Sequence, residues 1–294
     1  MSKKANLAAA KKAKNDEFYT QLVDIENEVK HYKPHFKGKV VLCNCDDPKE
    51  SQFAKYFRSN FHHLGLKKLI ITHYKDTNLS KAAPYRLDYV PAKSKKGRNT
   101  TKSTKMKLVG DGDFRSPEAV AALSEADIVV TNPPFSLFRE YIDQLITHDK
   151  KFLVIGNMNA ITYKEVFKLI QQDKVWLGNS HPKTFRQPNN TFKTFGNIEW
   201  FTNLPHKKRN DSITLYKTYT PQEFPKYDNY NAIEVSKVAD IPVNYSGEMG
   251  VPITFLGKYN PKQFEIVRFR KGNDDKDLSI KGKFPYFRIV IKRK

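Results

Sequence analysis

The spacing of hydrophobic positions changes several times along the chain, and each spacing indicates a secondary-structure element. Short apolar runs with polar flanks are typical of buried strands, and apolar residues three and four positions apart are typical of helices. The two patterns alternate through the first part of the chain. The predicted strands are 39–45, 68–72, 105–109, 127–131 and 152–155, and the predicted helices are 16–30, 48–60, 117–124, 137–146 and 164–171.

This alternation predicts an α/β fold built on a doubly wound, mostly parallel sheet. Such sheets bind ligands at the carboxyl ends of their strands, near the point where the strand order reverses. Residues that directly follow a predicted strand are therefore the first candidates for a functional site.

Two regions depart from the pattern. Residues 75–104 include a basic, polar run, and we expect an inserted basic hairpin in which 85–90 pairs with 105–109; a solvated loop is the alternative. After residue 205 the helical spacing is lost, and short aromatic strands are expected at 213–219 and 264–269.

The chain therefore divides into three predicted regions. Residues 1–14 are rich in Lys and Ala and suit a mobile basic arm. Residues 15–204 form the main domain with its insertion, and residues 205–294 form a C-terminal region. A length of 294 residues suits one large α/β domain with a smaller appendage.

The charge balance indicates a polyanionic partner. The 52 Lys and Arg residues outnumber the 31 Asp and Glu residues, for a formal net charge of +21. Nucleic acid is favoured over a membrane surface, because no basic amphipathic helix of the membrane-surface kind is evident.

The remaining composition excludes several classes of protein. No apolar run is long enough for a membrane span, and the N-terminus lacks the apolar core of a signal peptide. Cys43 and Cys45 give no disulfide framework, so a cytoplasmic location is expected. No second ligand pair accompanies them at a zinc-like spacing, so we expect no metal site.

The most informative motif is Asn132-Pro133-Pro134-Phe135, directly after the strand predicted at 127–131. Two prolines force extended backbone and have no N–H group, so the turn offers carbonyl acceptors and few donors. Asn132 adds an amide oxygen and Phe135 an aromatic face. Acceptors beside a stacking ring suit a planar nucleobase with an exocyclic amino group; a plain proline-rich turn is the alternative.

This tetrapeptide matches the (Asp/Asn/Ser)-Pro-Pro-(Tyr/Phe/Trp) signature of the amino-methyltransferases, which methylate adenine N6 or cytosine N4. Longer stretches resemble the EcoRI-type adenine-specific DNA methyltransferases. These stretches are 15–20, 41–48, 112–116 and 131–141, and the similarity continues through 156–157 and 250–256. The resemblance implies a Rossmann-like domain that uses S-adenosylmethionine, with target recognition mainly in the C-terminal region.

The resemblance also implies where the cofactor lies. Asp113 and Phe114 resemble the pair that binds the cofactor's adenine, with the carboxylate on the amino group and the ring against the purine. Tyr19 and Thr20 resemble the segment over the methionine end. Each has a structural alternative: Asp113 as a helix cap, and Tyr19-Thr20 as an ordinary helix start.

The segment after the first predicted strand is expected to complete the cofactor site through Asn44, Cys45 and Asp46, together with Asn132. This segment contains no glycine, unlike the usual glycine-rich family pattern. Asp47, followed by proline and then by Glu50, has the signature of a helix cap, so Asp46 is the better candidate for a cofactor contact. The acid that holds the ribose stays unassigned.

The chemistry expected at the motif is activation of a weakly nucleophilic amine. Asn132 and the Pro133 carbonyl would accept both amine hydrogens, Pro134 would hold the turn, and Phe135 would stack on the base. A base inside a duplex cannot reach such a pocket, so the target nucleotide is expected to flip out.

Basic residues interleaved with aromatic rings at 179–197 suit phosphate and unstacked bases, and a solvated loop is the alternative. A second basic cluster starts the C-terminal region. The predicted DNA contacts are Lys183, Arg186, Asn189, Lys193, Lys207, Lys208 and Arg209.

The sequence thus predicts a site-specific DNA adenine-N6 methyltransferase. The alternatives are a cytosine-N4 or RNA adenine methyltransferase, and a non-catalytic DNA-binding protein on the same scaffold. A bacterial or phage-encoded monomer is expected, with a restriction endonuclease as a possible companion that forms no stable complex with it.

Overall fold

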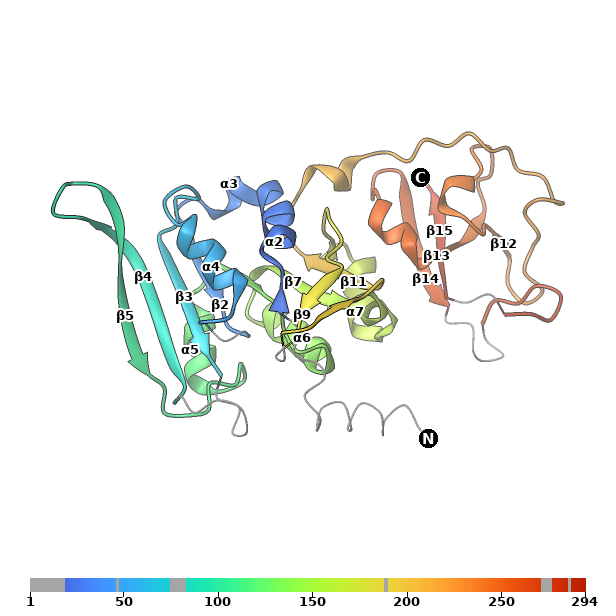
Figure 1. Cartoon of the computed structure of the whole chain (residues 1–294). Helices are drawn as coiled ribbons and strands as arrows, with labels where there is room; N and C mark the ends of the chain where they lie inside the picture. Colours follow the sequence, from blue (N-terminus) through green and yellow to red (C-terminus); the bar gives the residue numbers. More distant parts are fainter. Residues whose placement is uncertain (1–18, 46–47, 75–82, 188–189, 271–276, 285–286) are drawn as a thin grey trace. The chain divides into compact units, whose positions relative to one another are not determined.

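The computed structural model describes residues 19–45, 48–74, 83–187, 190–270, 277–284 and 287–294 (Figure 1). The predicted arm at 1–14, Asp46 and Asn189 lie outside these residues. The chain forms two compact units, the first from Met1–Ala160 and Gly178–Leu204 and the second from Ile161–Leu177 and Pro205–Lys294. One division between the units falls between Leu204 and Pro205, and Ile161–Leu177 groups with the residues after it.

The first unit is built on a large sheet with the strand order β5-β4-β3-β2-β6-β7-β11. β3, β2, β6 and β7 run parallel to one another, while β4, β5 and β11 pair antiparallel. The sheet is therefore mixed rather than mostly parallel. Its strands are β2 (Val40–Cys43), β3 (Lys68–His73), β4 (Tyr85–Lys93), β5 (Asn99–Lys107), β6 (Ile128–Thr131), β7 (Lys151–Asn157) and β11 (Ile198–Thr202).

Helices pack against both faces of this sheet. Trp200 on β11 contacts Phe53 of α4, and the next residue, Phe201, contacts Phe138 of α6. Because successive side chains of a strand point to opposite faces, α4 and α6 lie on opposite sides. The helical segments are α2 (Leu22–Val29), η1 (Lys30–Tyr32), α3 (Lys33–Phe36), α4 (Gln52–Ser59), α5 (Pro117–Glu125), η2 (Phe135–Leu137), α6 (Phe138–Thr147) and η3 (Met158–Thr162).

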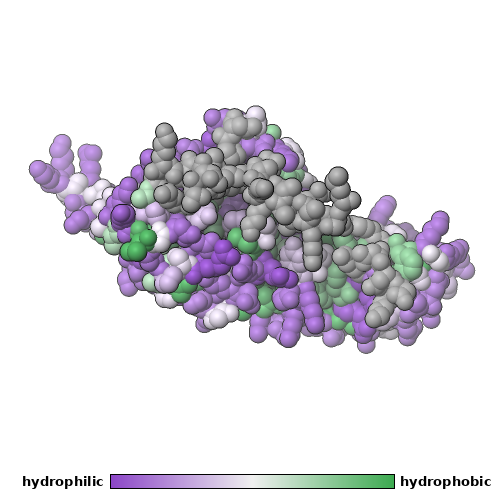
Figure 2. Space-filling model, turned by 90° about the horizontal axis from the view of Figure 1, so that it is seen from below, coloured by the Kyte–Doolittle hydropathy of each residue, from purple (hydrophilic) through white to green (hydrophobic). Residues whose placement is uncertain are grey.

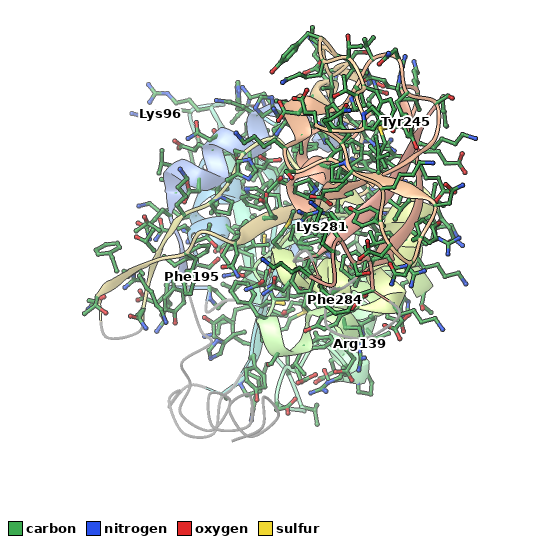
Figure 3. All side chains as sticks on the ribbon, turned by 90° about the vertical axis from the view of Figure 1, so that its right-hand side faces the viewer. Lys96, Arg139, Phe195, Tyr245, Lys281 and Phe284 are labelled. Carbon is green, nitrogen blue, oxygen red and sulfur yellow. The ribbon has the colours of Figure 1, made fainter. Side chains whose placement is uncertain are left out.

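The basic stretch after β3 forms a long antiparallel pair of strands at one edge of the sheet (Figure 1). Tyr85 lies opposite Lys107, and Lys93 lies opposite Asn99. Half of the basic run at 93–102 is strand, and residues 94–98 form the turn, which includes Lys96, labelled in Figure 3. As expected for the hairpin, residues 85–87 pair antiparallel with 105–107, but β5 begins already at Asn99 and ends at Lys107, so Leu108 and Val109 lie outside the strand.

α4 begins later than its sequence signature indicated. Ser51 is the N-cap, and its side chain accepts a hydrogen bond from the Ala54 amide at 3.2 Å. The residues before it, 48–50, form a turn instead of the first helical turn. Pro48 and Glu50 fit a helix start locally, but the Ser51 cap places that start at Gln52, four residues further on.

An ion pair between β4 and α5 gives the first unit a pH-dependent contact. The Arg86 guanidinium donates to both carboxylate oxygens of Glu125, at 2.7 and 2.6 Å. This hydrogen bonding lowers the pKa of Glu125 from 4.5 to about 2. A carboxylate with a lowered folded-state pKa stabilises the fold above its unfolded pKa, and that stabilisation is lost as the pH falls through the folded value.

We therefore expect Glu125→Gln to lower the melting temperature at neutral pH. The difference from wild type should shrink as the pH falls from 4.5 towards about 2, where the wild-type carboxylate also becomes neutral. Thermal unfolding followed by circular dichroism at a series of pH values measures this. A difference that stays constant across the range would contradict the assignment.

The second unit centres on a smaller sheet with the order β12-β13-β15-β14. Helix α7 packs on it: Phe167 contacts the Phe269 ring at 5.3 Å, and Gln171 donates to the Val267 carbonyl at 2.6 Å. The elements are α7 (Lys164–Gln171), β8 (Trp176–Leu177), η4 (Lys207–Asn210), β12 (Ala232–Glu234), η5 (Val238–Asp240), β13 (Glu248–Pro252), η6 (Ile253–Lys258), β14 (Phe264–Arg270) and β15 (Arg288–Arg293).

One of the two aromatic strands expected in this unit is present. Residues 264–269 lie in β14, whereas 213–219 form no strand and contribute only an isolated bridge from Lys217 to Pro242. The alternating sequence pattern at 213–219 favours a strand, but a strand also needs a neighbouring strand to pair with, and the pattern does not predict one. Among the described residues, no helix has the length and apolar character needed to cross a membrane, and no cluster of His, Cys, Asp or Glu is arranged to hold a metal ion.

Candidate active site

The Asn-Pro-Pro-Phe motif lies at the carboxyl end of β6, a central parallel strand. Asn132 is buried, with 7% of its surface exposed, and Pro134 has extended backbone (φ −55°, ψ 126°). Because the prolines hold the chain extended, no helical turn forms until η2 begins at Phe135, whose ring is half-buried. The turn thus presents an amide, carbonyls and a ring at the sheet edge where ligands bind in such folds.

The end of β2 lies beside the end of β6. The Cys45 amide donates to the Thr131 hydroxyl at 3.2 Å, which links the residue after Asn44 to the residue before Asn132. Asn44 is also buried. The structure therefore places the predicted segments 44–45 and 132–135 next to each other.

Tyr141 of α6 fixes the position of Asn44. Its hydroxyl donates to Asn44 Oδ1 at 2.5 Å, and burial raises the pKa of the Tyr141 phenol far above its usual value. The phenol therefore stays protonated and keeps the orientation of the Asn44 amide defined. Helical spacing placed Tyr141 in the core, but only the structure shows this hydrogen bond.

The loop that contains Asp113 and Phe114 contacts Tyr141, the same residue that binds Asn44. The Phe114 and Tyr141 rings meet edge to face with centroids 5.0 Å apart, and Gln144 donates to the Phe114 carbonyl at 3.0 Å. The Arg115 guanidinium binds both carboxylate oxygens of Asp113 at 2.8 Å. This hydrogen bonding with Asp113 raises the pKa of Arg115, so the cation is permanent.

Gly112 allows this loop to approach the end of β3. Its φ of +81° is a conformation that side chains disfavour, and a Cβ there would lie 2.5 Å from the His73 carbonyl oxygen. The ends of β2, β3 and β6 and the loop after β5 therefore converge on one edge of the sheet.

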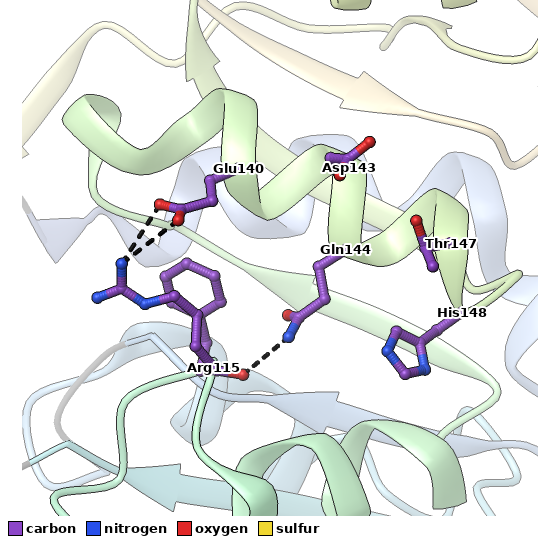
Figure 4. A pocket seen from close by; sticks show the side chains of 7 residues that line it. Arg115, Glu140, Asp143, Gln144, Thr147 and His148 are labelled. Atoms are coloured by element: carbon purple, nitrogen blue, oxygen red, sulfur yellow. Dashed lines mark hydrogen bonds and ion pairs between the residues drawn. The ribbon is translucent and has the colours of Figure 1, made fainter.

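A pocket of about 260 Å³ opens on the outer side of α6 (Figure 4). Arg115 reaches across it towards Glu140, 3.3 Å away. Its described lining also includes Phe114 and residues of α6, but none of residues 132–135. This pocket therefore adjoins Phe114 and Arg115 but is not lined by the motif.

Tyr19 and Thr20 form β1, not the start of a helix as the alternative had it. β1 pairs antiparallel with β9 (Thr184–Arg186), which pairs in turn with β10 (Phe192–Thr194). Thr20 is buried, and its hydroxyl has no hydrogen-bond partner among the described residues. A buried hydroxyl of this kind is expected to meet a polar group of a ligand or water.

The predicted DNA contacts of the first unit gather on the β9–β10 hairpin. Lys183 and Lys193 are exposed, and Phe192 is 63% exposed. Phe195, labelled in Figure 3, packs on the buried Phe185 of β9, with ring centroids 5.7 Å apart. The side chains drawn in Figure 2 are mostly hydrophilic, in keeping with the net charge of +21.

The two predicted arginine contacts differ from these lysines, because each has an acidic partner. Arg186 binds Glu50 with Nη2 and Oε2 2.5 Å apart, and its guanidinium lies over the Tyr19 ring. In the second unit, Arg209 pairs with Asp173 and lies over Trp176 at 3.8 Å. Lys207 is exposed there and Lys208 is half-exposed.

Sequence reasoning missed four residues that organise this region: Thr131, Tyr141, Arg115 and Glu50. Each acts on a predicted residue through a hydrogen bond or ion pair. A tyrosine at a buried helical position and an arginine directly after Asp-Phe were the available signals, since buried polar groups need partners.

Comparisons with known proteins identify the family of the chain. The family model for the adenine-specific methyltransferase EcoRI matches residues 6–294. The chain is 49% identical to the type II methyltransferase M.EcoRI of Escherichia coli over 98% of this chain and 96% of the relative. It is 40% identical to the type II methyltransferase M.MgeORF184P of Mycoplasma genitalium and 38% identical to M.MpnI of Mycoplasma pneumoniae, each over 97% of both chains. No solved structure was found to match.

These matches run over nearly the whole length of the chain, and they include every predicted site segment except the first few residues of the arm. The chain belongs to the EcoRI family of adenine-specific methyltransferases.

Proposed function

We propose that the protein is a site-specific DNA methyltransferase that transfers a methyl group from S-adenosylmethionine to N6 of an adenine flipped out of duplex DNA. The observation that carries this proposal is the buried Asn132 at the end of β6, beside Asn44 and the Asp113-Phe114 loop. Family membership supports adenine as the target. The mixed sheet would then be an elaborated Rossmann-like methyltransferase sheet.

The residues at the sheet edge suit S-adenosylmethionine. Asp113 offers a carboxylate to an adenine amino group, Phe114 offers a ring, and the buried Thr20 hydroxyl lacks a partner among the described residues. Asn44 and Cys45 would border the same ligand. When bound, the cofactor supplies an electrophilic methyl group on a sulfonium centre. Its ribose partner stays unassigned, because Tyr74, and no acid, directly follows β3. Asp46, a further expected cofactor contact, lies outside the described residues.

Catalysis by this chain would consist of orienting and polarising the target amine. The Asn132 side-chain oxygen and the Pro133 carbonyl accept the two N–H groups, which concentrates electron density on nitrogen. Phe135 stacks on the base and keeps the amine in line with the methyl donor. No strong base is needed, since the methylated amine is cationic and loses its proton easily.

DNA binding would use the exposed cations of both units, with Lys183 and Lys193 on the β9–β10 hairpin and Lys207 and Lys208 in η4. Backbone contacts from such side chains help offset the cost of flipping a base. The exposed Phe192 ring on the same hairpin suits stacking on an unpaired base. We assign the rest of target recognition to residues 205–294.

Removing one of these cations should change the salt dependence of binding. Lys193→Ala is expected to lower DNA affinity and to reduce the slope of log K against log salt by about one unit, since one phosphate contact is lost. Fluorescence anisotropy with a labelled duplex at several salt concentrations measures the slope.

Lys96→Ala is the matched control, because it removes the same charge from the turn of the β4–β5 pair. Its slope should equal that of wild type. An unchanged slope for Lys193→Ala would place the phosphate contacts elsewhere. Equal changes in both variants would mean that the effect depends on net charge alone.

The alternatives differ in product and are separated by one analysis. Digestion of treated DNA and RNA to nucleosides should yield N6-methyl-2′-deoxyadenosine from the DNA and no N6-methyladenosine from the RNA. N4-methylcytosine, or methylation of RNA alone, would keep the amine chemistry and change the substrate. Absence of any product, together with absence of cofactor binding, would favour the non-catalytic DNA-binding protein.

The biological setting follows from the relatives, whose names mark them as type II methyltransferases of bacteria. We propose that this protein acts in a bacterial cytoplasm as a monomer. A restriction endonuclease that recognises the same site would then be a companion in the cell without forming a stable complex.

A further inference from the structure

The small sheet β1-β9-β10 brings together two segments that the sequence separates widely. β1 carries Tyr19 and Thr20, the residues proposed to cover the methionine end of the cofactor. β9 and β10 carry the hairpin proposed to contact DNA. Tyr19 lies opposite Arg186, and Thr20 lies opposite Phe185.

Arg186 ties three pieces of the chain together. Its guanidinium lies over the Tyr19 ring, with the central carbon 5.0 Å from the centroid. Nη2 binds Glu50 Oε2 at 2.5 Å, and Nη1 binds Asn190 Oδ1 at 2.7 Å. These contacts connect β1, the turn that precedes α4, and the hairpin loop. A flat guanidinium can stack and form two directed hydrogen bonds at once, which a lysine cannot do.

These contacts suit Arg186 to a role other than that of a simple phosphate contact. Its side chain is 23% exposed, and its charge is already paired with that of Glu50. A phosphate would have to compete with this carboxylate. Lys193, by contrast, lies on the same hairpin and is exposed.

We infer that Arg186 is a positioning residue that couples cofactor binding to DNA binding by holding Tyr19 on the hairpin. This inference rests on the proposed function of the two segments. The described part of β1 is two residues long, and both residues pair with β9, which the Arg186 contacts tie to the Tyr19 ring. DNA that fixes the hairpin therefore fixes β1, and a cofactor that orders β1 fixes the hairpin.

Thermodynamic linkage makes such coupling measurable from either side. If the bound cofactor product raises DNA affinity by some factor, then DNA must raise the affinity for that product by the same factor. Replacing a residue that only contacts a DNA phosphate need not change this coupling. The two roles of Arg186 therefore predict different results for the same substitution.

The test is Arg186→Lys, which keeps the positive charge and removes the stacked, forked geometry. Calorimetry on the DNA-bound protein should show its affinity for S-adenosylhomocysteine reduced by roughly tenfold, a size typical of coupling between sites. DNA affinity without the ligand should change little, with an unchanged salt slope. The increase in DNA affinity that S-adenosylhomocysteine causes in wild type should be largely lost.

Two further variants separate coupling from charge. Glu50→Gln removes the partner of Arg186 and should reproduce the loss of coupling, although it makes the protein more basic. Lys193→Ala should weaken DNA binding and leave the affinity for S-adenosylhomocysteine unchanged. Circular dichroism spectra identical to wild type would show that all three variants are folded.

The outcomes distinguish the inference from the proposed function. Coupling of wild-type size in Arg186→Lys, or a wild type that binds both ligands without coupling, would overturn the inference and leave the methyltransferase assignment intact. A reduced salt slope in Arg186→Lys with normal coupling would make Arg186 a phosphate contact. A wild type that bound neither ligand would remove the proposed function as well as the coupling.

Discussion

Replacing Asn132 by alanine is expected to slow methyl transfer by about a hundredfold to a thousandfold, the usual effect of removing one preorganised group that stabilises a transition state. In the proposed mechanism, the amide oxygen accepts a hydrogen bond that strengthens as charge develops on the target amine, so its loss slows the chemical step. Binding of S-adenosylhomocysteine and of DNA should change much less. Single-turnover kinetics with radiolabelled cofactor, alongside both binding constants, measure the difference.

Two substitutions control for the shape of the site. Asn132→Asp and Asn132→Ser both keep an oxygen at this position, and both residues occur in the amino-methyltransferase signature. Each should transfer methyl groups faster than Asn132→Ala. If the alanine variant kept wild-type rates, or if all three variants were equally slow with normal binding, the proposed acceptor role would be wrong.

Replacing Asp113 by alanine is expected to weaken S-adenosylhomocysteine binding by about tenfold to a hundredfold, since a hydrogen bond to a charged group is lost. Arg115 holds this carboxylate through two hydrogen bonds of 2.8 Å, so in the wild type its direction is fixed before the ligand arrives. The Michaelis constant for S-adenosylmethionine should rise, while the rate at saturating cofactor should change little.

Asp143→Asn is a suitable comparison for this experiment. The substitution removes the charge of Asp143, an exposed residue of α6 that lines the pocket beside Phe114. Cofactor affinity should be unaffected by it. A normal Michaelis constant in Asp113→Ala, or a fall in the saturated rate alone, would mean that Asp113 does not hold the cofactor's adenine.

The central elements of the fold could be predicted because burial leaves a simple signal. β2, β6 and β7 are buried on both faces and read as apolar runs, and the amphipathic face of α6 is visible in the sequence. The motif could be placed for the same reason, since it directly follows such a run. Chemistry that depends on local sequence was therefore accessible without coordinates.

The contacts that organise the site could not be predicted, because they join residues far apart in the chain. Asn44 and Tyr141 are separated by 97 positions, and Glu50 and Arg186 by 136. Local signals also misled where two caps competed: the residues before Ser51 fit a helix start, yet the helix uses Ser51. At 213–219 an alternating pattern had no strand to pair with, so it gave no sheet.

The measurement that tests the central claim most directly is incubation of the purified protein with unmethylated plasmid and S-adenosylmethionine, followed by single-molecule sequencing for modified bases. Our account predicts N6-methyladenine at one recurrent short motif, and none when Asn132→Ala replaces the wild type over the same short reaction time. N4-methylcytosine, methylation without a recurrent motif, or an unmodified plasmid despite measurable cofactor binding would contradict it.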